Sequence, residues 1–165
     1  VTAANRLIRR ELIIQNNLFF KEGIIHEDNY WTFFLAKHIN RMAICKDNVY
    51  NYRLTPGSIT NKVNVEKETF AFKTMITDFC NNIDRFEKGA QKRDIFCLLL
   101  NAINSHYYKD NNERTQLISC FQKQNGLFIN CLLMIVFSVK KCTVVRNKSI
   151  NLLMKIFESN SWLCQ

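Results

Sequence analysis

Apolar residues recur with helical spacing at the start of the chain. They predict a helix over residues 4–17, with an apolar stripe formed by Leu7, Ile8, Leu12 and Ile14. A segment interrupted by Gly23 follows, and a second, aromatic helix is predicted from Asp28 to about Asn40. Residues 42–45 and 49–54 then have the pattern of a short β pair, closed by a turn at Pro56-Gly57.

The pattern changes near Lys62 to a succession of helices. We predict them at residues 65–87, 91–109, 113–124, 126–142 and 147–160. The joints between them are placed at Gly89, Asp110-Asn111-Asn112, Gly126 and Arg146-Asn147. The predicted fold class is therefore mainly α, with a mixed α/β part over residues 1–62 and an all-α extension over residues 63–165.

The most apolar run extends from Leu127 to Val139 and is too short to span a bilayer. Its apolar residues lie all round the helix, which favours a buried core helix. The alternative is a helix in the membrane interface, with Lys140 and Lys141 at the lipid headgroups.

Net charge narrows the classes of partner. The chain of 165 residues has a formal charge of +9, and Glu158 is the only acidic residue after Thr115. A basic surface suits nucleic acid, anionic lipid or phosphorylated substrates, or it is simply solvated. No nucleic-acid-binding motif accompanies the charge, so no nucleic acid is expected as a partner. The seven cysteines form no Cys-x-x-Cys pair, so we expect no zinc site and free, buried thiols in a reducing cytosol.

Candidate chemistry is concentrated between Phe19 and Asn61. Glu27 and Asp28 stand at the start of the aromatic helix, where free backbone N–H groups and the helix dipole favour ionised carboxylates. An ionised and fixed carboxylate is what a general base requires. The alternative is that the two residues only cap the helix.

The order of motifs over roughly the first 62 residues resembles the second half of the catalytic domain of family 2 glycosyltransferases, which have the GT-A fold. The shared series is a Phe-x-x-Gly approach, a Glu-Asp pair, an aromatic helix, a strand ending in Tyr-x-Tyr-Arg and a Ser-Ile turn. The matching segments are residues 5–11 before the approach, Phe20 to Gly23, Glu27-Asp28, Tyr30 to Phe34, Tyr50 to Arg53 and Ser58-Ile59.

The resemblance implies roles for individual residues. Asp28 would be the catalytic base that deprotonates the acceptor hydroxyl, and Glu27 would orient or tune it. Four further residues would contact substrates, each with a purely structural alternative: Arg53 at the donor phosphates, Ser58 at a substrate hydroxyl, His26 at phosphate or metal, and Trp31 stacked on a sugar ring.

The chain also departs from the family pattern. It contains no Asp-x-Asp motif, no Gln-x-x-Arg-Trp motif, and Thr55 where many members have a second Arg. We therefore expect the C-terminal part of a longer, inverting bacterial hexosyltransferase of polysaccharide biosynthesis, inactive alone. The divalent metal (Mg or Mn) of the whole protein would have its ligands mostly outside this chain, and none is expected here.

The implied partners of the whole protein are a nucleotide-sugar donor and a glycan or lipid-linked acceptor, in the cytoplasm or at the inner face of the cell membrane. An anionic membrane surface and a homodimer are further options. The alternative function is a non-enzymatic helical module for interaction or membrane docking.

Overall fold

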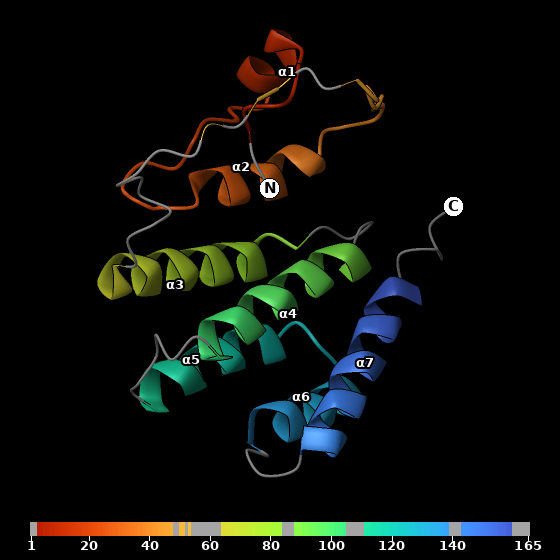
Figure 1. Ribbon diagram of the computed structural model, residues 1–165. Helices are drawn as coiled ribbons and strands as arrows, with labels where there is room; N and C mark the ends of the chain where they lie inside the picture. Colours follow the sequence, from red (N-terminus) through yellow and green to blue (C-terminus); the bar gives the residue numbers. More distant parts are fainter. Residues whose placement is uncertain are drawn as a thin grey trace. The chain divides into compact units, whose positions relative to one another are not determined.

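The computed structural model describes residues 3–47, 50–51, 53, 64–83, 88–104, 111–138 and 143–159, with Lys88 and residues 143–145 described as backbone only (Figure 1). The described residues form seven α-helices and no β-strand, so the predicted mainly α class is confirmed. The chain divides into an N-terminal unit, residues 1–71, and a C-terminal unit, residues 72–165. The predicted domain boundary at Lys62 lies outside the described residues.

Helix α1 (Arg10–Gln15) is shorter than the predicted segment 4–17. It ends where the two asparagines predict an end, because Asn17 adopts the left-handed conformation with φ 51°. The Asn17 N–H donates to the Ile14 carbonyl (3.2 Å) and the Leu18 N–H to the Ile13 carbonyl (2.9 Å). These two bonds are the Schellman motif, which satisfies the last carbonyls of a helix. The turn also directs Leu18 into the core.

Helix α2 (Glu27–Ala36) carries most of the N-terminal core. Its buried residues Trp31 and Leu35 form a cluster with Leu18, against which α1 residues pack. The Trp31 indole Nε1–H donates to the Leu18 carbonyl at 3.0 Å. A buried indole needs such a partner, so this bond fixes α2 against the end of α1.

The first strand of the predicted β pair, residues 42–45, is absent. Residues 42–45 are described, and they are exposed and have no regular hydrogen-bonded structure. The predicted second strand, residues 49–54, lies largely outside the described residues. Alternation of side chains is a weak signal over four residues, because a strand is stabilised by its pairing partner.

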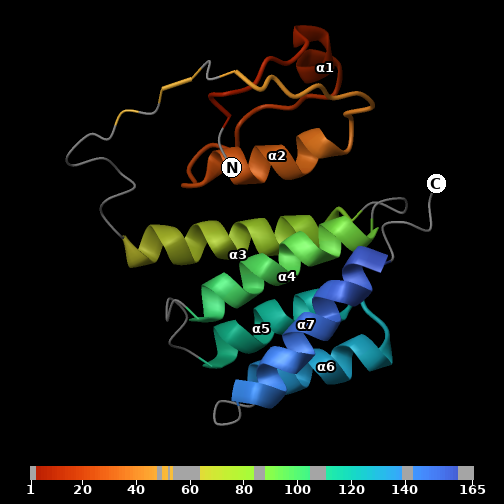
Figure 2. The same ribbon diagram turned by 45° about the vertical axis from the view of Figure 1, so that its right-hand side comes forward.

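The remaining helices are α3 (Val65–Asn81), α4 (Lys88–Asn104), α5 (Asn111–Gln122), α6 (Leu127–Ser138) and α7 (Thr143–Ser159). In the C-terminal unit, α4 contacts α5 and α7, and α6 contacts the same two helices (Figure 2). Helices α4 to α7 therefore close into a bundle.

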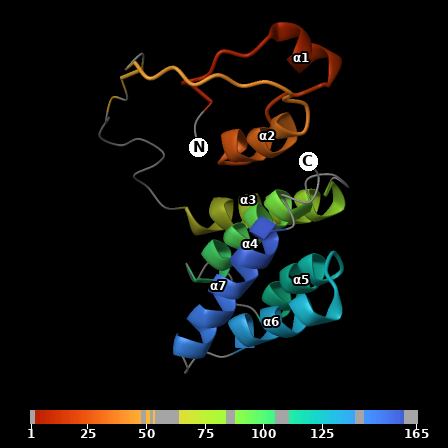
Figure 3. The ribbon, with the colours of Figure 1, turned by 90° about the vertical axis from the view of Figure 1, so that its right-hand side faces the viewer.

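Aromatic rings fill this bundle. Phe96 on α4, Phe121 on α5 and Phe157 on α7 are fully buried, with ring centroids 5.9–6.5 Å apart. Figure 3 shows α7 running beside α4 and reaching α6. Helix α7 therefore connects these two helices to the aromatic core. The aromatic spacing is typical of offset and edge-to-face pairs.

Three of the predicted joints differ from the structure, and at one of them Asn111 and Asn112 form the start of α5. Gly89 is buried inside the first turn of α4, and Arg146 lies within α7. Helix α3 ends earlier, at Asn81, and the Asn82 side chain donates to the Asp78 carbonyl at 2.8 Å. An asparagine side chain that binds the backbone of the preceding turn competes with continuation of the helix. The end of α3 therefore lies at Asn81, directly before Asn82, and not at Gly89. The predicted joint at Gly126 is confirmed.

Helix α6 is not the fully buried helix that its composition predicts. Leu133 and Val136 are buried, whereas Leu127, Phe128 and Met134 are 82%, 64% and 56% exposed. The described thiols differ from the expectation in the same way: all are free, but Cys45 and Cys131 are exposed. No described helix is long and apolar enough to cross a membrane.

Candidate functional site

The N-terminus of α2 is built on an unusual backbone conformation at His26. His26 is the residue before the first helical turn and has φ 62° and ψ 32°, in the left-handed region. Its carbonyl accepts from the N–H groups of Asn29 (3.0 Å) and Tyr30 (3.1 Å), so the helix begins immediately after it. A left-handed conformation costs free energy in a residue with a side chain, so other contacts must hold His26 in place.

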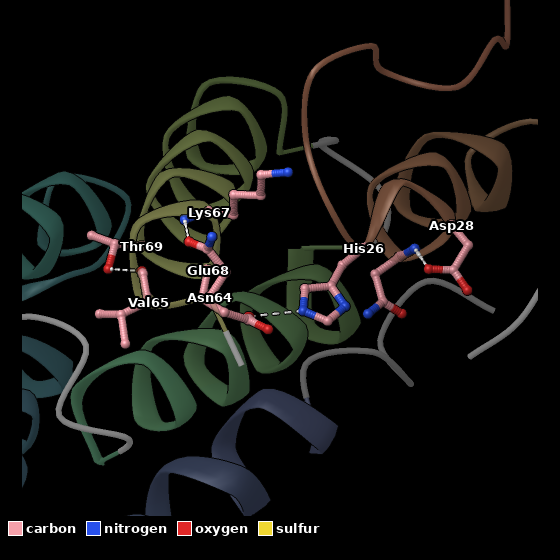
Figure 4. Close-up of polar contacts among 8 residues, drawn as sticks. His26, Asp28, Asn64, Val65, Lys67, Glu68 and Thr69 are labelled. Atoms are coloured by element: carbon pink, nitrogen blue, oxygen red, sulfur yellow. Dashed lines mark hydrogen bonds and ion pairs between the residues drawn. The ribbon is translucent and has the colours of Figure 1, made fainter. Parts of the chain in front are cut away.

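A pairing with helix α3 supplies such a contact. His26 Nε2 lies 2.9 Å from Glu68 Oε2 (Figure 4). The Glu68 side chain is only 15% exposed and that of His26 is 39% exposed. Asn64 caps α3 through a hydrogen bond from the Lys67 N–H to Asn64 Oδ1 at 3.0 Å, which fixes the turn that carries Glu68.

Asp28 is held by the first turn of its own helix. Its Oδ1 accepts from the Asn29 N–H at 2.8 Å, and its carboxylate is partly buried. Its carbonyl accepts from the Thr32 hydroxyl at 2.7 Å, and Arg6 Nη1 donates to the same hydroxyl at 3.1 Å. A carboxylate has several acceptor sites, so Asp28 can accept a substrate hydroxyl in addition to the backbone N–H. Glu27 beside it is exposed.

An open depression of about 440 Å³ lies between the approach to α2 and the first turns of α3. It is lined by the apolar segment Gly23, Ile24 and Ile25, and by Glu66, Lys67 and Phe70. All six residues belong to the N-terminal unit. Gly23 has φ 78°, which only glycine adopts without cost, and this turn shapes one wall of the depression.

Trp31 does not have the position that a sugar-stacking residue needs. It is 6% exposed, belongs to the core cluster and packs against Phe20 in a tilted geometry, with ring centroids 5.1 Å apart. Other side chains therefore cover its ring, and Trp31 is a core residue of the N-terminal unit. A helical tryptophan one turn after a helix start commonly turns inward because burial of its large ring is favourable.

The structure describes one of the other two predicted substrate contacts, Arg53. Arg53 is exposed, and its neighbours Tyr52 and Leu54 are outside the described residues, as is Ser58. Glu68, in contrast, belongs to the site although it was not predicted from the sequence, because no sequence pattern indicates its contact with His26. It is one of two acidic residues in the first turn of α3, and its partner is 42 positions away.

The described ranges contain no group of three or more His, Cys, Asp or Glu residues close enough together to hold a metal ion. The candidate site consists of the fixed carboxylate of Asp28, the exposed carboxylate of Glu27, and His26 paired to Glu68.

No known protein family, curated protein or solved structure matches the chain.

Proposed function

We propose that the chain is the C-terminal part of a nucleotide-sugar-dependent, inverting glycosyltransferase of family 2 and supplies its acceptor-side catalytic base. The observation that carries the proposal is Asp28, a partly buried carboxylate fixed by a backbone N–H at the start of α2. It stands within the ordered series of motifs that resembles this family.

In this proposal Asp28 takes the proton of the acceptor hydroxyl as that oxygen attacks the anomeric carbon of the donor sugar. A general base requires a carboxylate held within hydrogen-bond reach of the proton it accepts. The Asn29 N–H orients one carboxylate oxygen and leaves the group able to accept a further hydrogen bond. His26, held by Glu68, fixes the backbone from which α2 starts and so the position of Asp28.

The surface of the N-terminal unit also supports the proposal. Large apolar side chains are exposed along it, including Leu7 (105%), Phe19 (63%), Met42 (80%) and Ile44 (79%). In this proposal another part of the whole protein covers these side chains, since contiguous exposed apolar surface marks interaction sites. A donor-binding half with a divalent metal site would cover such a face in the whole enzyme, which we place in the cytoplasm and assign to bacterial polysaccharide synthesis.

The test uses the whole protein encoded by the gene. Transfer from nucleotide-sugar donors to glycan and lipid-linked acceptors is measured by release of the nucleoside diphosphate. Asp28→Asn is expected to lower kcat by about a thousandfold, because general-base catalysis contributes roughly 10²–10⁴-fold. Glu22→Gln is the matched control, since Glu22 is an exposed carboxylate of the same unit outside α2.

Circular dichroism must show the same helix content in both variants. Unchanged turnover in Asp28→Asn would refute the role of Asp28. Turnover by the 165-residue chain alone would refute the proposal that the donor-binding half of the enzyme lies outside this chain. The alternative, a non-enzymatic helical module with Glu27 and Asp28 as a cap, predicts no transfer by the whole protein.

A further inference from the structure

One face of α6 is apolar and exposed. Leu127, Cys131 and Met134 are spaced by four and three residues, which places them on one side of a helix, and Phe128 flanks them. Leu127, Phe128 and Met134 are more than half exposed, and Cys131 is also exposed. We call these four residues the α6 stripe. The opposite side of the helix carries Leu133 and Val136, which are buried in the bundle.

A helix at the surface of a bundle normally turns polar residues outward. Helix α6 contains no charged residue at all, so its exposed face cannot be solvated in the usual way. The helix lies at an edge of the C-terminal bundle in the ribbon views (Figures 1–3), and the exposed fractions of its side chains show that this face is accessible to a partner. The α6 stripe is therefore a candidate docking surface.

The net charge of the C-terminal unit indicates the kind of partner. After Thr115 the sequence holds six basic residues and one acidic residue, Glu158. Helix α7 packs beside α6 and exposes Lys148, Leu152 and Lys155, which are spaced to share one helix face. Glu158 lies 3.9 Å from Arg93, so the one acidic group of the region is near a cation.

We propose that the α6 stripe docks on an anionic phospholipid bilayer, with α6 lying in the plane of the interface. A helix of this kind buries its apolar face about 5–10 Å into the boundary between headgroups and acyl chains. Lysine side chains on the neighbouring helix extend their charged ends toward the phosphates. The twelve residues of α6 give a length of about 18 Å, which is well short of a bilayer core of about 30 Å.

A second copy of the chain fits this surface less well. A self-association through the α6 stripe would bring together two surfaces of the same positive sign, and like charges across an interface oppose binding. An anionic lipid surface offers the opposite charge and accepts an apolar helix face of any outline. Charge complementarity therefore favours the bilayer.

The test is co-sedimentation of the 165-residue chain with vesicles of phosphatidylcholine and phosphatidylglycerol in equal parts, and with vesicles of phosphatidylcholine alone. The stripe variant is Phe128→Gln with Met134→Gln. Its matched control is Leu7→Gln with Met42→Gln, which removes two exposed apolar side chains from the other unit. A charge variant, Lys148→Gln with Lys155→Gln, examines the basic contribution separately.

The native chain and the matched control are expected to bind the anionic vesicles about equally. The stripe variant is expected to partition at least tenfold more weakly. The charge variant, like the native chain at high salt, is expected to bind several-fold more weakly, and vesicles of phosphatidylcholine alone should bind little. Helix content is checked by circular dichroism for every variant.

Three results would overturn the proposal. One is that the native chain stays in the supernatant with anionic vesicles. Another is that the stripe variant binds the anionic vesicles as the native chain does, whatever the charge variant does. The third is a dimer in sedimentation velocity that the stripe variant dissociates while vesicles bind neither form, because the α6 stripe would then be a contact between copies. None of these results bears on Asp28, so this inference fails or stands independently of the proposed reaction.

Discussion

At the residue scale, the site depends on an interaction that crosses the sequence. Glu27 and Asp28 are recognisable from the sequence because acidic residues at a helix start have a local physical reason. The contact of His26 with Glu68 has no local signal, since it depends on how the chain brings α3 beside the start of α2. Trp31 was ambiguous for a related reason: its type allows either stacking on a sugar or burial, and only packing decides between them.

This pairing leads to the first prediction. Glu68→Ala is expected to lower the free energy of unfolding by about 1 kcal/mol, because it removes a partly buried, charge-assisted hydrogen bond and leaves His26 without that partner. The measurement is urea denaturation followed by circular dichroism. Glu66→Ala is the matched control, because Glu66 is an exposed carboxylate in the same first turn of α3. Equal losses in the two variants would mean that only the helix dipole is affected.

At the element scale, the number and order of the C-terminal helices follow from the sequence, and several of their ends do not. The apolar periodicity is continuous enough to predict five helices from Val65 onward, and the described part of this region contains five. Their ends depend on side chains that bind neighbouring backbone groups, as Asn82 does after α3. The prediction that α6 is fully buried was wrong. An apolar composition indicates which faces of a helix can be buried, but the neighbouring helices determine which faces are buried.

The contact between Cys80 on α3 and Cys120 on α5 gives a pH-dependent prediction. Burial raises the pKa of the Cys80 thiol, and the neighbouring Cys120 adds to the effect through charge repulsion and a hydrogen bond. The folded chain therefore keeps the proton at a pH where the unfolded chain loses it, above about pH 8.5. Stability is unaffected by this group below that pH and falls above it, by at most about 1.4 kcal/mol per pH unit.

The measurement is the free energy of unfolding between neutral and alkaline pH under reducing conditions. Cys80→Ser is expected to show a shallower fall than the native chain, because serine does not ionise in this range. Parallel curves for the two proteins would show that Cys80 ionises equally in the folded and unfolded states.

At the scale of the whole molecule, each of the two units has a hydrophobic core among its described residues. The N-terminal core is the cluster around Trp31, whereas the C-terminal core is built on the three phenylalanines of α4, α5 and α7. The C-terminal unit also has thirteen basic residues against seven acidic ones, which gives it most of the positive charge of the chain. A complete aromatic core of this kind is expected to fold without the preceding residues.

The corresponding prediction concerns a fragment of residues 64–165, which begins at the Asn64 cap of α3. It is expected to show helical circular dichroism and one cooperative urea transition, because α4 to α7 close on each other. Phe121→Ala in the fragment is expected to lower the free energy of unfolding by about 3–5 kcal/mol, since the deleted ring leaves a cavity among Phe96 and Phe157. A fragment without a cooperative transition would show that this core needs residues 1–63.

The hydrogen bond from Trp31 to the Leu18 carbonyl has a practical consequence. An indole proton that is both bonded and shielded exchanges with deuterium only when its surroundings open. In a proton NMR spectrum indole signals are well separated from the others, so the decay of this one signal in heavy water would time the local opening of the segment that carries Asp28. The same signal, followed while acceptor glycans are added, would test the proposed acceptor site by reporting whether these glycans slow that opening.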